Sequence, residues 1–288
     1  MDDYLPPEDD ELALIPVEAI KTPEPTGNFD FDPSRSSSEL ALLNVTAEHT
    51  DPQSGAIRYW SFSTLSVFKE CRYRVRKRKI ERIPEPSGPA ADRGNEIHDQ
   101  AEHYVDGSSD ELPKAKKIEV FQSRFNALRE EYQAGNVELE QDWWFDADWT
   151  PIEAKGKPHD CEALWYIAKL DVFLWESKTC ARIIDHKTGK KYEMKHSQQA
   201  MQYAIAAFMR YPELEYIETE FWYLDQGSEL RKSYTREQAM VMLPRVASNA
   251  LELTTCHKDA FTPNPSAWNC RFCHYATSGD CEYAYEAL

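Results

Sequence analysis

Two strand-like runs joined by a short polar turn lie at the centre of the chain and constrain its fold most. Residues 165–175 are rich in aromatic and β-branched side chains, and Cys180 to Lys187 forms a second such run after the turn. A hairpin of this kind predicts part of a β-sheet. Asp171 interrupts the first run, and a charge in an apolar strand is costly unless it is paired or bound to a metal.

The second strand ends on Asp185, His186 and Lys187. Side chains alternate between the two faces of a strand, so Asp185 and Lys187 project from the same side. A carboxylate can hold a hard divalent cation, and a nearby ammonium can stabilise charge on a phosphate, which is the chemistry of metal-assisted phosphodiester hydrolysis. An exposed ion pair is the simpler alternative for an isolated pair of this type.

Two helical segments carry further polar candidates. A helix beginning near Asp92 places His98 and Glu102 one turn apart, and a helix over residues 197–209 does the same for Gln199 and Tyr203. Taken alone, each pair is more simply a solvated or hydrogen-bonded surface feature. The hairpin and these helices together predict an α/β fold.

The order of these motifs resembles the RecB-like branch of the PD-(D/E)XK nuclease superfamily. The resemblance runs from about Ser61 to the C-terminus and includes Ser63-Thr64-Leu65 with Phe68 and Cys71, Arg93-Gly94 with Ile97, His98 and Glu102, Asp171, residues 184–190, and Gln199 with Tyr203. It implies a central mixed β-sheet flanked by helices. Relatives usually carry glycine three residues before the first aspartate, where this chain has Ala168, a mild change.

The resemblance also implies roles for individual residues. The carboxylates of Asp171 and Asp185, the His98 ring and the main-chain carbonyl of His186 would bind Mg²⁺ or Mn²⁺. Lys187 would be the catalytic lysine, and Gln199 and Tyr203 would support the site and the DNA strand. An acidic residue of the strand-like segment 137–145 would complete the site, with Glu140 preferred and Glu138 as the competing choice.

Three of the seven cysteines lie close to the C-terminus: Cys270, Cys273 and Cys281. A C-x-x-C pair can grip one metal or cluster, because the turn between the cysteines directs both sulfurs inward. By resemblance to CRISPR-adaptation nucleases and the AddB nuclease domain, Cys71 is the fourth ligand of a [4Fe–4S] cluster. Zinc, with His274 or another residue in place of one cysteine, is the competing occupant, and free thiols are the third possibility. Cys161, Cys180 and Cys256 fit packing positions.

The acidic charge of the chain is unevenly distributed. Of a net charge of −17, residues 1–55 contribute 13 acidic and 2 basic side chains. This segment has few aromatic residues, so we expect an acidic, disordered tail. Its apolar stretch 12–17 could be a docking peptide. Alternatively, the acidic segment competes with DNA for the site or is an inert solubilising tail. Residues 56–288 would form the nuclease domain, with cluster-binding elements at Cys71 and residues 268–283.

A basic run of eight cations within residues 69–82 stands against this acidic average. A local patch is enough to neutralise phosphates, so the run is a candidate DNA-binding surface, although a solvated face is the commoner explanation for such a run. The candidate contacts are Arg72, Tyr73, Arg74, Arg76, Lys77, Arg78 and Lys79, flanked by Lys69 and Arg82.

The remaining segments read as scaffold. We expect an amphipathic helix over residues 120–133, a strand over 216–224 and a helix over 235–255 that Pro244 interrupts. The chain shows no internal repeat, phosphate-binding glycine loop, helicase motif, signal peptide or long apolar segment. We therefore expect a cytoplasmic location, no membrane partner and no disulfides.

The function that these observations favour is a metal-dependent DNA nuclease, preferably an exonuclease on single-stranded DNA or DNA ends. Recombination, repair or CRISPR-type adaptation, in a bacterium or a phage-infected cell, would be its setting. A helicase, recombinase or single-strand-binding protein would be a fitting partner. A non-catalytic DNA-binding adaptor and an RNA-processing nuclease are the alternatives.

Overall fold

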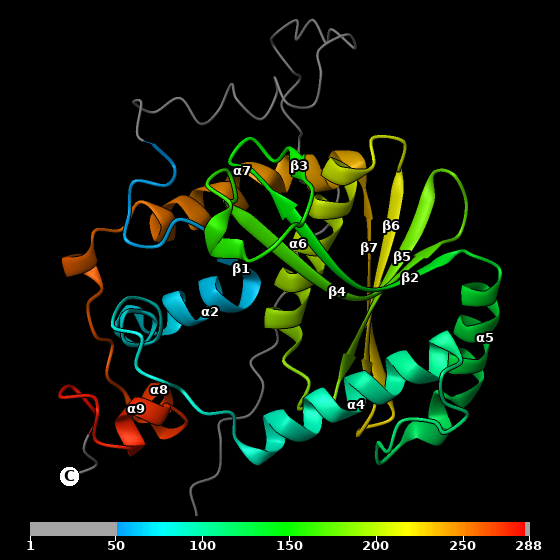
Figure 1. Cartoon of the computed structure of the whole chain (residues 1–288), viewed down its shortest axis with the longest axis horizontal. Helices are drawn as coiled ribbons and strands as arrows, with labels where there is room; N and C mark the ends of the chain where they lie inside the picture. The colour runs from blue at the N-terminus through cyan, green and yellow to red at the C-terminus, as the bar shows by residue number, and fades with distance from the viewer. Residues whose placement is uncertain (1–50, 286–288) are drawn as a thin grey trace, which may run out of the picture. The chain divides into compact units, whose positions relative to one another are not determined.

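The structure is a computed structural model that describes residues 51–285 (Figure 1). The predicted acidic tail and its apolar stretch 12–17 lie outside these residues, except for positions 51–55. Those five residues pack against the chain, because the Gly55 N–H donates to the Thr254 carbonyl at 2.8 Å. A β-carbon added at Gly55 would lie 2.5 Å from that same oxygen. This close approach requires glycine.

A seven-stranded mixed sheet forms the centre of the fold, as the sequence predicts. Its path is β3-β2-β4-β5-β6-β7, and β1 pairs with β4 outside this path. The pairs β5–β6 and β1–β4 are parallel, and the others are antiparallel. The strands are β1 (Trp60–Ser61), β2 (Val137–Phe145), β3 (Pro151–Ile152), β4 (Tyr166–Trp175), β5 (Cys180–Lys187), β6 (Tyr216–Tyr223) and β7 (Ser228–Thr235).

One edge of β4 is shared by two different strands, which leaves a gap between them. Strand β1 pairs with β4 at Tyr166 and Ile167, and β5 pairs with β4 only from Val172 onward. On this edge, residues 168–171 therefore have no paired strand within the described part of the chain. Asp171 lies at the end of this gap, where a ligand can approach the backbone.

Helices cover both faces of the sheet (Figure 1). Helices α4 and α5 pack on one face around Val172, Ile184 and Trp222, whereas α6 and α7 pack on the other around Phe173, Ile183 and Phe221. The helices are α2 (Phe62–Glu70), α3 (Arg72–Val75), α4 (Pro89–Asp106), α5 (Gln122–Gln133), α6 (Glu193–Arg210), α7 (Arg236–Thr254), α8 (Ala267–Arg271) and α9 (His274–Thr277), with a π-helical turn at Arg76–Ile80 and short 3₁₀ turns at Ile118–Val120, Pro158–Asp160 and Lys258–Ala260.

The predicted interruption at Pro244 is wrong, because α7 runs through it. Proline removes one backbone donor from a helix, but apolar side chains on both sides of it pack against the same core and hold the two halves in line. These side chains include Leu243, Val246 and Ala250. The helix expected over residues 120–133 begins slightly later, at Gln122, after a 3₁₀ turn.

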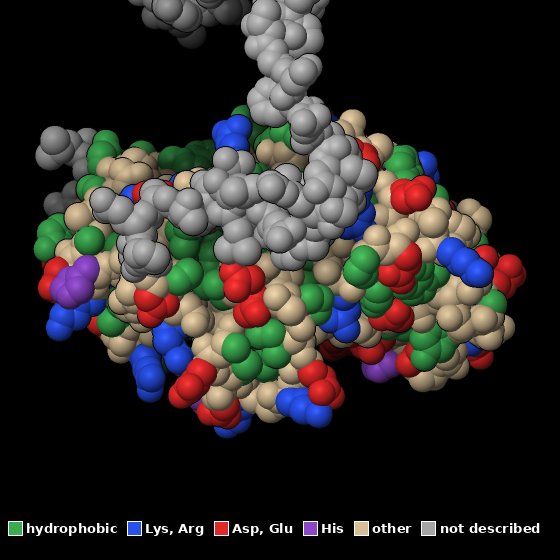
Figure 2. Space-filling model, turned by 90° about the horizontal axis from the view of Figure 1, so that it is seen from above, with side chains coloured by type: hydrophobic (Ala, Val, Ile, Leu, Met, Phe, Trp, Pro, Cys, Tyr) green, Lys and Arg blue, Asp and Glu red, His purple; other side chains and the backbone are tan. Residues whose placement is uncertain are grey.

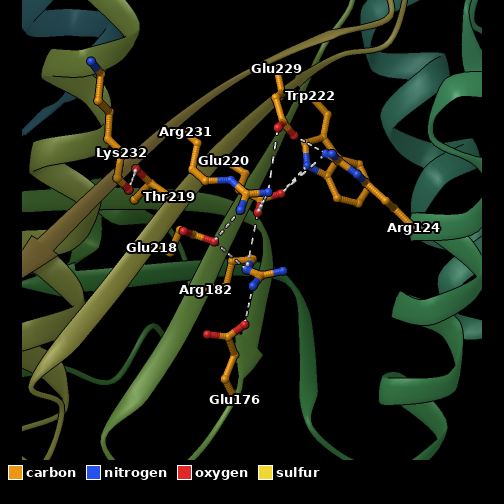
Figure 3. Close-up of polar contacts among 10 residues, drawn as sticks. All are labelled: Arg124, Glu176, Arg182, Glu218, Thr219, Glu220, Trp222, Glu229, Arg231 and Lys232. Atoms are coloured by element: carbon orange, nitrogen blue, oxygen red, sulfur yellow. Dashed lines mark hydrogen bonds and ion pairs between the residues drawn. The ribbon is translucent and has the colours of Figure 1, made fainter.

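A network of arginines and glutamates lies on the α5 face of the sheet (Figure 3). Glu220 of β6 is only 1% exposed, and Trp222 Nε1 donates to its Oε2 at 2.6 Å. Arg231 Nη2 lies 2.9 Å and Arg182 Nε 3.4 Å from its Oε1. Because a buried carboxylate needs such partners, the network fixes the relative positions of β5, β6 and β7.

No helix of the described residues is both long and apolar enough to span a membrane.

Candidate active site

The gap beside β4 brings together residues from α4, β2 and β4. His98 Nδ1 lies 3.2 Å from Asp171 Oδ2. One ligand atom each from His98, Glu140 and Asp171 lie within 4.8 Å of one another. Among residues 51–285, this is the only such group of three histidine, cysteine or carboxylate ligands. The described chain thus has one clear candidate for a site of this composition.

An unusual backbone conformation places Glu140. In the register of β2 with β4, Leu139 pairs with Val172 and Gln141 with Leu170, so Glu140 lies opposite Asp171. Its φ of 47° is in the left-handed region, which non-glycine residues seldom adopt, and it breaks the regular pairing. The competing residue, Glu138, instead accepts a hydrogen bond from Trp175 Nε1 at 3.2 Å. The geometry therefore favours Glu140.

The electrostatics of the three residues are coupled. Burial opposes a charge on His98, but the hydrogen bond and the negative charge of Asp171 raise its pKa to about 9. Burial likewise opposes a charge on Asp171, yet His98 brings the pKa of that carboxyl down to about 2. Burial together with the charges of Asp171 and Glu102 raises the pKa of Glu140 to about 7. A second negative charge, on Glu140 beside Asp171, is therefore disfavoured.

These donors fit a hard divalent cation. Two carboxylates and one imidazole are ligands that Mn²⁺ accepts readily, and carboxylates are those that Mg²⁺ prefers. A cation would offset both the burial and the neighbouring negative charges that raise the pKa of Glu140. When the His98 ring is protonated, it is itself the positive partner of Asp171, in the place that a cation would take.

Asp185 and Lys187 lie beside this group on the side of β5 that faces α6. Lys187 Nζ lies 2.5 Å from Asp185 Oδ1 and forms an ion pair with it. Tyr203 Oη donates to Asp185 Oδ2 at 2.8 Å, and Gln199 Nε2 donates to the same oxygen at 3.2 Å. Burial raises the pKa of Asp185, while Lys187 opposes this effect. Gln199 and Tyr203 thus hold the carboxylate in one orientation.

The backbone of His186 faces the gap. Its N–H donates to Asp171 Oδ2 at 2.7 Å, taking the place of a strand partner. In a strand the N–H and carbonyl of one residue point toward the same neighbour, so the His186 carbonyl also faces β4. Its ring is buried, which lowers the pKa of His186 to about 4 and leaves the imidazole neutral.

Helix α4 is anchored by the Arg93-Gly94 pair of the sequence motif. The Arg93 guanidinium binds both carboxylate oxygens of Asp225, at 2.7 and 2.9 Å. A β-carbon at Gly94 would lie 3.4 Å from Thr188 Oγ1, so a small residue lets the helix lie close to the end of β5. These contacts fix the position of α4, and therefore the distance between His98 on this helix and Asp171 on β4.

A cavity of about 340 Å³ opens from the gap and is lined by Gln199, Tyr203 and the exposed Arg78, Lys79 and Lys169, among others. Tyr73 and Lys77 of the basic run are buried. Most of the other cations in the run are already paired: Lys69 and Arg72 with Glu252, Arg74 with Glu85, and Arg76 with Glu81.

Basic side chains are also dispersed elsewhere. On the face shown in Figure 2, acidic and basic side chains of the described residues are interspersed. Only Arg78 and Lys79 of the predicted DNA-binding run line the cavity beside Gln199 and Tyr203. The structure thus brings the end of the run to the cavity beside Gln199 and Tyr203, where Arg78 also lies 3.9 Å from Glu85, and leaves the beginning of the run in ion pairs.

The four predicted cluster ligands meet at a second place. Cys71, Cys270, Cys273 and Cys281 line one pocket between the end of α2 and the C-terminal helices. The pocket is closed by hydrogen bonds from the Asn264 and Asn269 amides to the Glu70 carbonyl, at 2.9 and 3.1 Å. Cys161, Cys180 and Cys256 are not among the residues that line it.

Sequence reasoning missed several residues around the site. Lys169 lines the cavity, and Asp225 holds α4 through Arg93. An isolated lysine or aspartate gives no sequence signal, because its role depends on strand register. Glu102 was noted only as part of a helical pair, yet its charge acts on Glu140.

One protein family matches most of the chain. A solved structure described as "Crystal structure of SSO0001" is 14% identical and covers 87% of this chain and 95% of its own, with a TM-score of 0.39, a level of likeness that carries no inference. None of the curated proteins matches the chain. The family model of the PD-(D/E)XK nuclease superfamily matches residues 59–278, which include every residue of the gap and three of the four clustered cysteines. The chain belongs to the PD-(D/E)XK nuclease superfamily.

Proposed function

We propose that this protein is a Mg²⁺- or Mn²⁺-dependent deoxyribonuclease. The observation that carries the proposal is the grouping of His98, Glu140 and Asp171 in the gap beside β4, next to the Asp185–Lys187 pair. The superfamily match supports a metal-dependent nuclease, and the choice of DNA and of these residues is ours. Single-stranded DNA or DNA ends remain the favoured substrate, with exonucleolytic cutting in recombination, repair or CRISPR-type adaptation.

In the proposed mechanism, His98, Glu140, Asp171 and Asp185 would hold the cation, together with the His186 carbonyl. A divalent ion there would act as a Lewis acid on the phosphodiester. The Lys187 ammonium, held by Asp185, would orient the attacking water and stabilise the hydroxide that forms as this water loses its proton to solvent. It would also stabilise charge that develops on the phosphate. In-line attack would break the P–O3′ bond and leave a 5′-phosphate, with the leaving oxygen taking up a proton.

Arg78 and Lys79 would bind backbone phosphates in the adjoining cavity. Tyr203 and Gln199 would act through Asp185 by fixing its orientation. An adaptor that binds DNA without cutting it would not need the ion pair between Asp185 and Lys187.

We also propose a [4Fe–4S] cluster at the four cysteines. Tetrahedral zinc with Zn–S distances of about 2.3 Å would bring its sulfurs to within about 4 Å of one another. Among residues 51–285, however, no three cysteine sulfurs lie within 4.8 Å of one another. Since that compact arrangement of sulfurs is not present among the described residues, we favour a cubane cluster, whose thiolates bind at separate iron corners, for the pocket that the four cysteines share.

Two measurements test these proposals. The wild-type protein is incubated with DNA and RNA strands labelled at the 5′ or 3′ end, single- and double-stranded, in Mn²⁺ and in EDTA. Mn²⁺-dependent cutting of DNA is the expected result, and the label pattern gives the polarity. Binding without cutting would favour the adaptor, and cutting of RNA alone would refute the deoxyribonuclease.

For the cluster, the protein is purified without oxygen and its iron, sulfide and zinc are measured. Broad visible absorption that is lost in Cys71→Ala, with iron and sulfide in equal amounts, is expected. The matched control is Cys161→Ala, which lies outside the pocket. A colourless protein that carries stoichiometric zinc would overturn the cluster assignment.

A further inference from the structure

Two large aromatic side chains are exposed together on the C-terminal lobe. Trp268 is 70% exposed and Phe272 is 69% exposed. They lie four residues apart along α8 and its end, and their rings meet edge to face with centroids 6.5 Å apart. Single exposed apolar residues need no explanation, whereas two neighbouring exposed aromatics form a contiguous apolar surface that a partner can cover.

The segment that carries this pair has no acidic side chain of its own. The chain has 50 acidic residues among 288, yet residues 260–279 contain none. Arg271 lies between the two aromatics in sequence, and its guanidinium is 5.3 Å from the Phe272 ring centroid. A guanidinium beside exposed aromatic rings is the combination that binds the phosphates and bases of an unpaired strand.

A chain of contacts links this surface to the active site. The Asn269 amide donates to the Glu70 carbonyl at 3.1 Å, and the Glu70 carboxylate pairs with Lys195 of α6 at 3.2 Å. Lys195 precedes Gln199 by one helical turn. The aromatic pair therefore lies on an element attached beside the helix that orients Asp185.

We propose that Trp268 and Phe272 form a stacking platform for the bases of single-stranded DNA, with Arg271 on the phosphates. This inference rests on the proposed function and names the part of the chain that prefers unpaired DNA. Duplex DNA keeps its bases stacked on one another, so it gains little from such a platform. The platform thus gives the binding a preference for single strands.

The fluorescence of Trp268 offers a selective test. Of the eight tryptophans, all within the described residues, only Trp268 is strongly exposed. Acrylamide quenching of the wild type and of Trp268→Phe isolates its signal, and oligothymidine is then added in EDTA to prevent cutting. We expect the Trp268 signal to be quenched by acrylamide and then to change on binding of the strand.

Affinity for the same strand is measured by anisotropy. Because stacking contributes roughly 1–3 kcal/mol per base, Trp268→Ala and Phe272→Ala should each weaken single-strand binding by about five-fold or more. Trp268→Phe should restore most of it. Duplex binding should change little, and Tyr132→Ala, a partly exposed aromatic on α5, is the matched control.

The outcomes separate this inference from the nuclease proposal. Unchanged single-strand affinity in both alanine variants, or a Trp268 signal that acrylamide does not reach, would overturn the platform even if the protein cuts DNA. Loss of affinity in those variants supports the platform even if no cutting is found. Equal losses on duplex and single strands would also contradict it.

Discussion

The ion pair between His98 and Asp171 gives the most quantitative prediction. In metal-free protein, Asp171→Asn removes the negative charge that holds the pKa of His98 near 9. Asparagine can still accept the hydrogen bond that the His186 N–H donates to Asp171, so the backbone there should be preserved. Burial alone disfavours the charged imidazole, so the pKa of His98 should fall below its ordinary value of 6.5.

The size of the effect follows from the two partners. A His98 pKa of about 9 instead of 6.5 corresponds to about 3 kcal/mol, since a ten-fold change in proton affinity is about 1.4 kcal/mol. An Asp171 pKa of about 2 instead of 3.8 gives about 2.5 kcal/mol. Both figures describe the same ion pair and are counted once, as about 2–3 kcal/mol.

The sign of the pH dependence is fixed by these shifts. A histidine with a raised pKa in the folded state stabilises the fold fully below about pH 6.5 and loses this contribution as the pH rises through about 9. Asp171→Asn should therefore lower the free energy of unfolding most near pH 6 and least above pH 9.

Histidine titration by NMR and denaturant unfolding at several pH values measure both quantities. Asp142→Asn, which removes an exposed partner of Lys169, is the control and should leave the pKa of His98 unchanged. A pKa of His98 that stays near 9 in Asp171→Asn would refute the reasoning.

Three further predictions concern the cation and the scaffold. Binding of Mn²⁺ at pH 8 should release about one proton from His98, and the affinity for Mn²⁺ should rise with pH up to about 9. Calorimetry in two buffers of different ionisation enthalpy measures the proton release. If no proton is released, His98 is not a ligand of the cation. Glu220→Ala should lower the free energy of unfolding by about 1–3 kcal/mol, because it leaves the buried Trp222 Nε1 donor without its acceptor. The exposed Glu153→Ala should change it by less than about 0.5 kcal/mol, and equal effects would contradict the network. Gly55→Ala should lower the free energy of unfolding by about 1–3 kcal/mol, because the added β-carbon clashes with the Thr254 carbonyl. Gly189→Ala is the neutral control, since a β-carbon there would meet no atom within 4 Å. Thermal unfolding compares the two variants, and equal melting temperatures would exclude the clash.

Local patterns were enough to predict much of the fold. The strands β4 and β5 and the helices α4 and α6 follow from periodic apolar residues, which depend on nearest neighbours along the chain. The alternation of side chains along a strand also places Asp185 and Lys187 on one side of β5. The grouping of His98 with Asp171 needed the resemblance, because their elements are far apart in sequence.

Other features depend on tertiary contacts that a sequence pattern does not encode. The preference for Glu140 over Glu138 rests on a left-handed backbone conformation in β2. The sequence suggests that Arg72 and Arg74 are unpaired cations. In the structure, Arg72 pairs with Glu252 of the distant helix α7, and Arg74 pairs with Glu85. The continuity of α7 through Pro244 likewise follows from packing on both sides of the proline.

The central claim is that the Asp185–Lys187 pair performs catalysis at the cation site. The most direct test compares Lys187→Ala with Lys190→Ala, an exposed lysine three residues further on, in Mn²⁺-dependent cutting of labelled single-stranded DNA. Losing one charge that stabilises the transition state should lower the cleavage rate by about 10²–10³-fold in Lys187→Ala, with DNA binding and folding retained and Lys190→Ala close to wild type. Cleavage at the wild-type rate in Lys187→Ala would contradict the assignment.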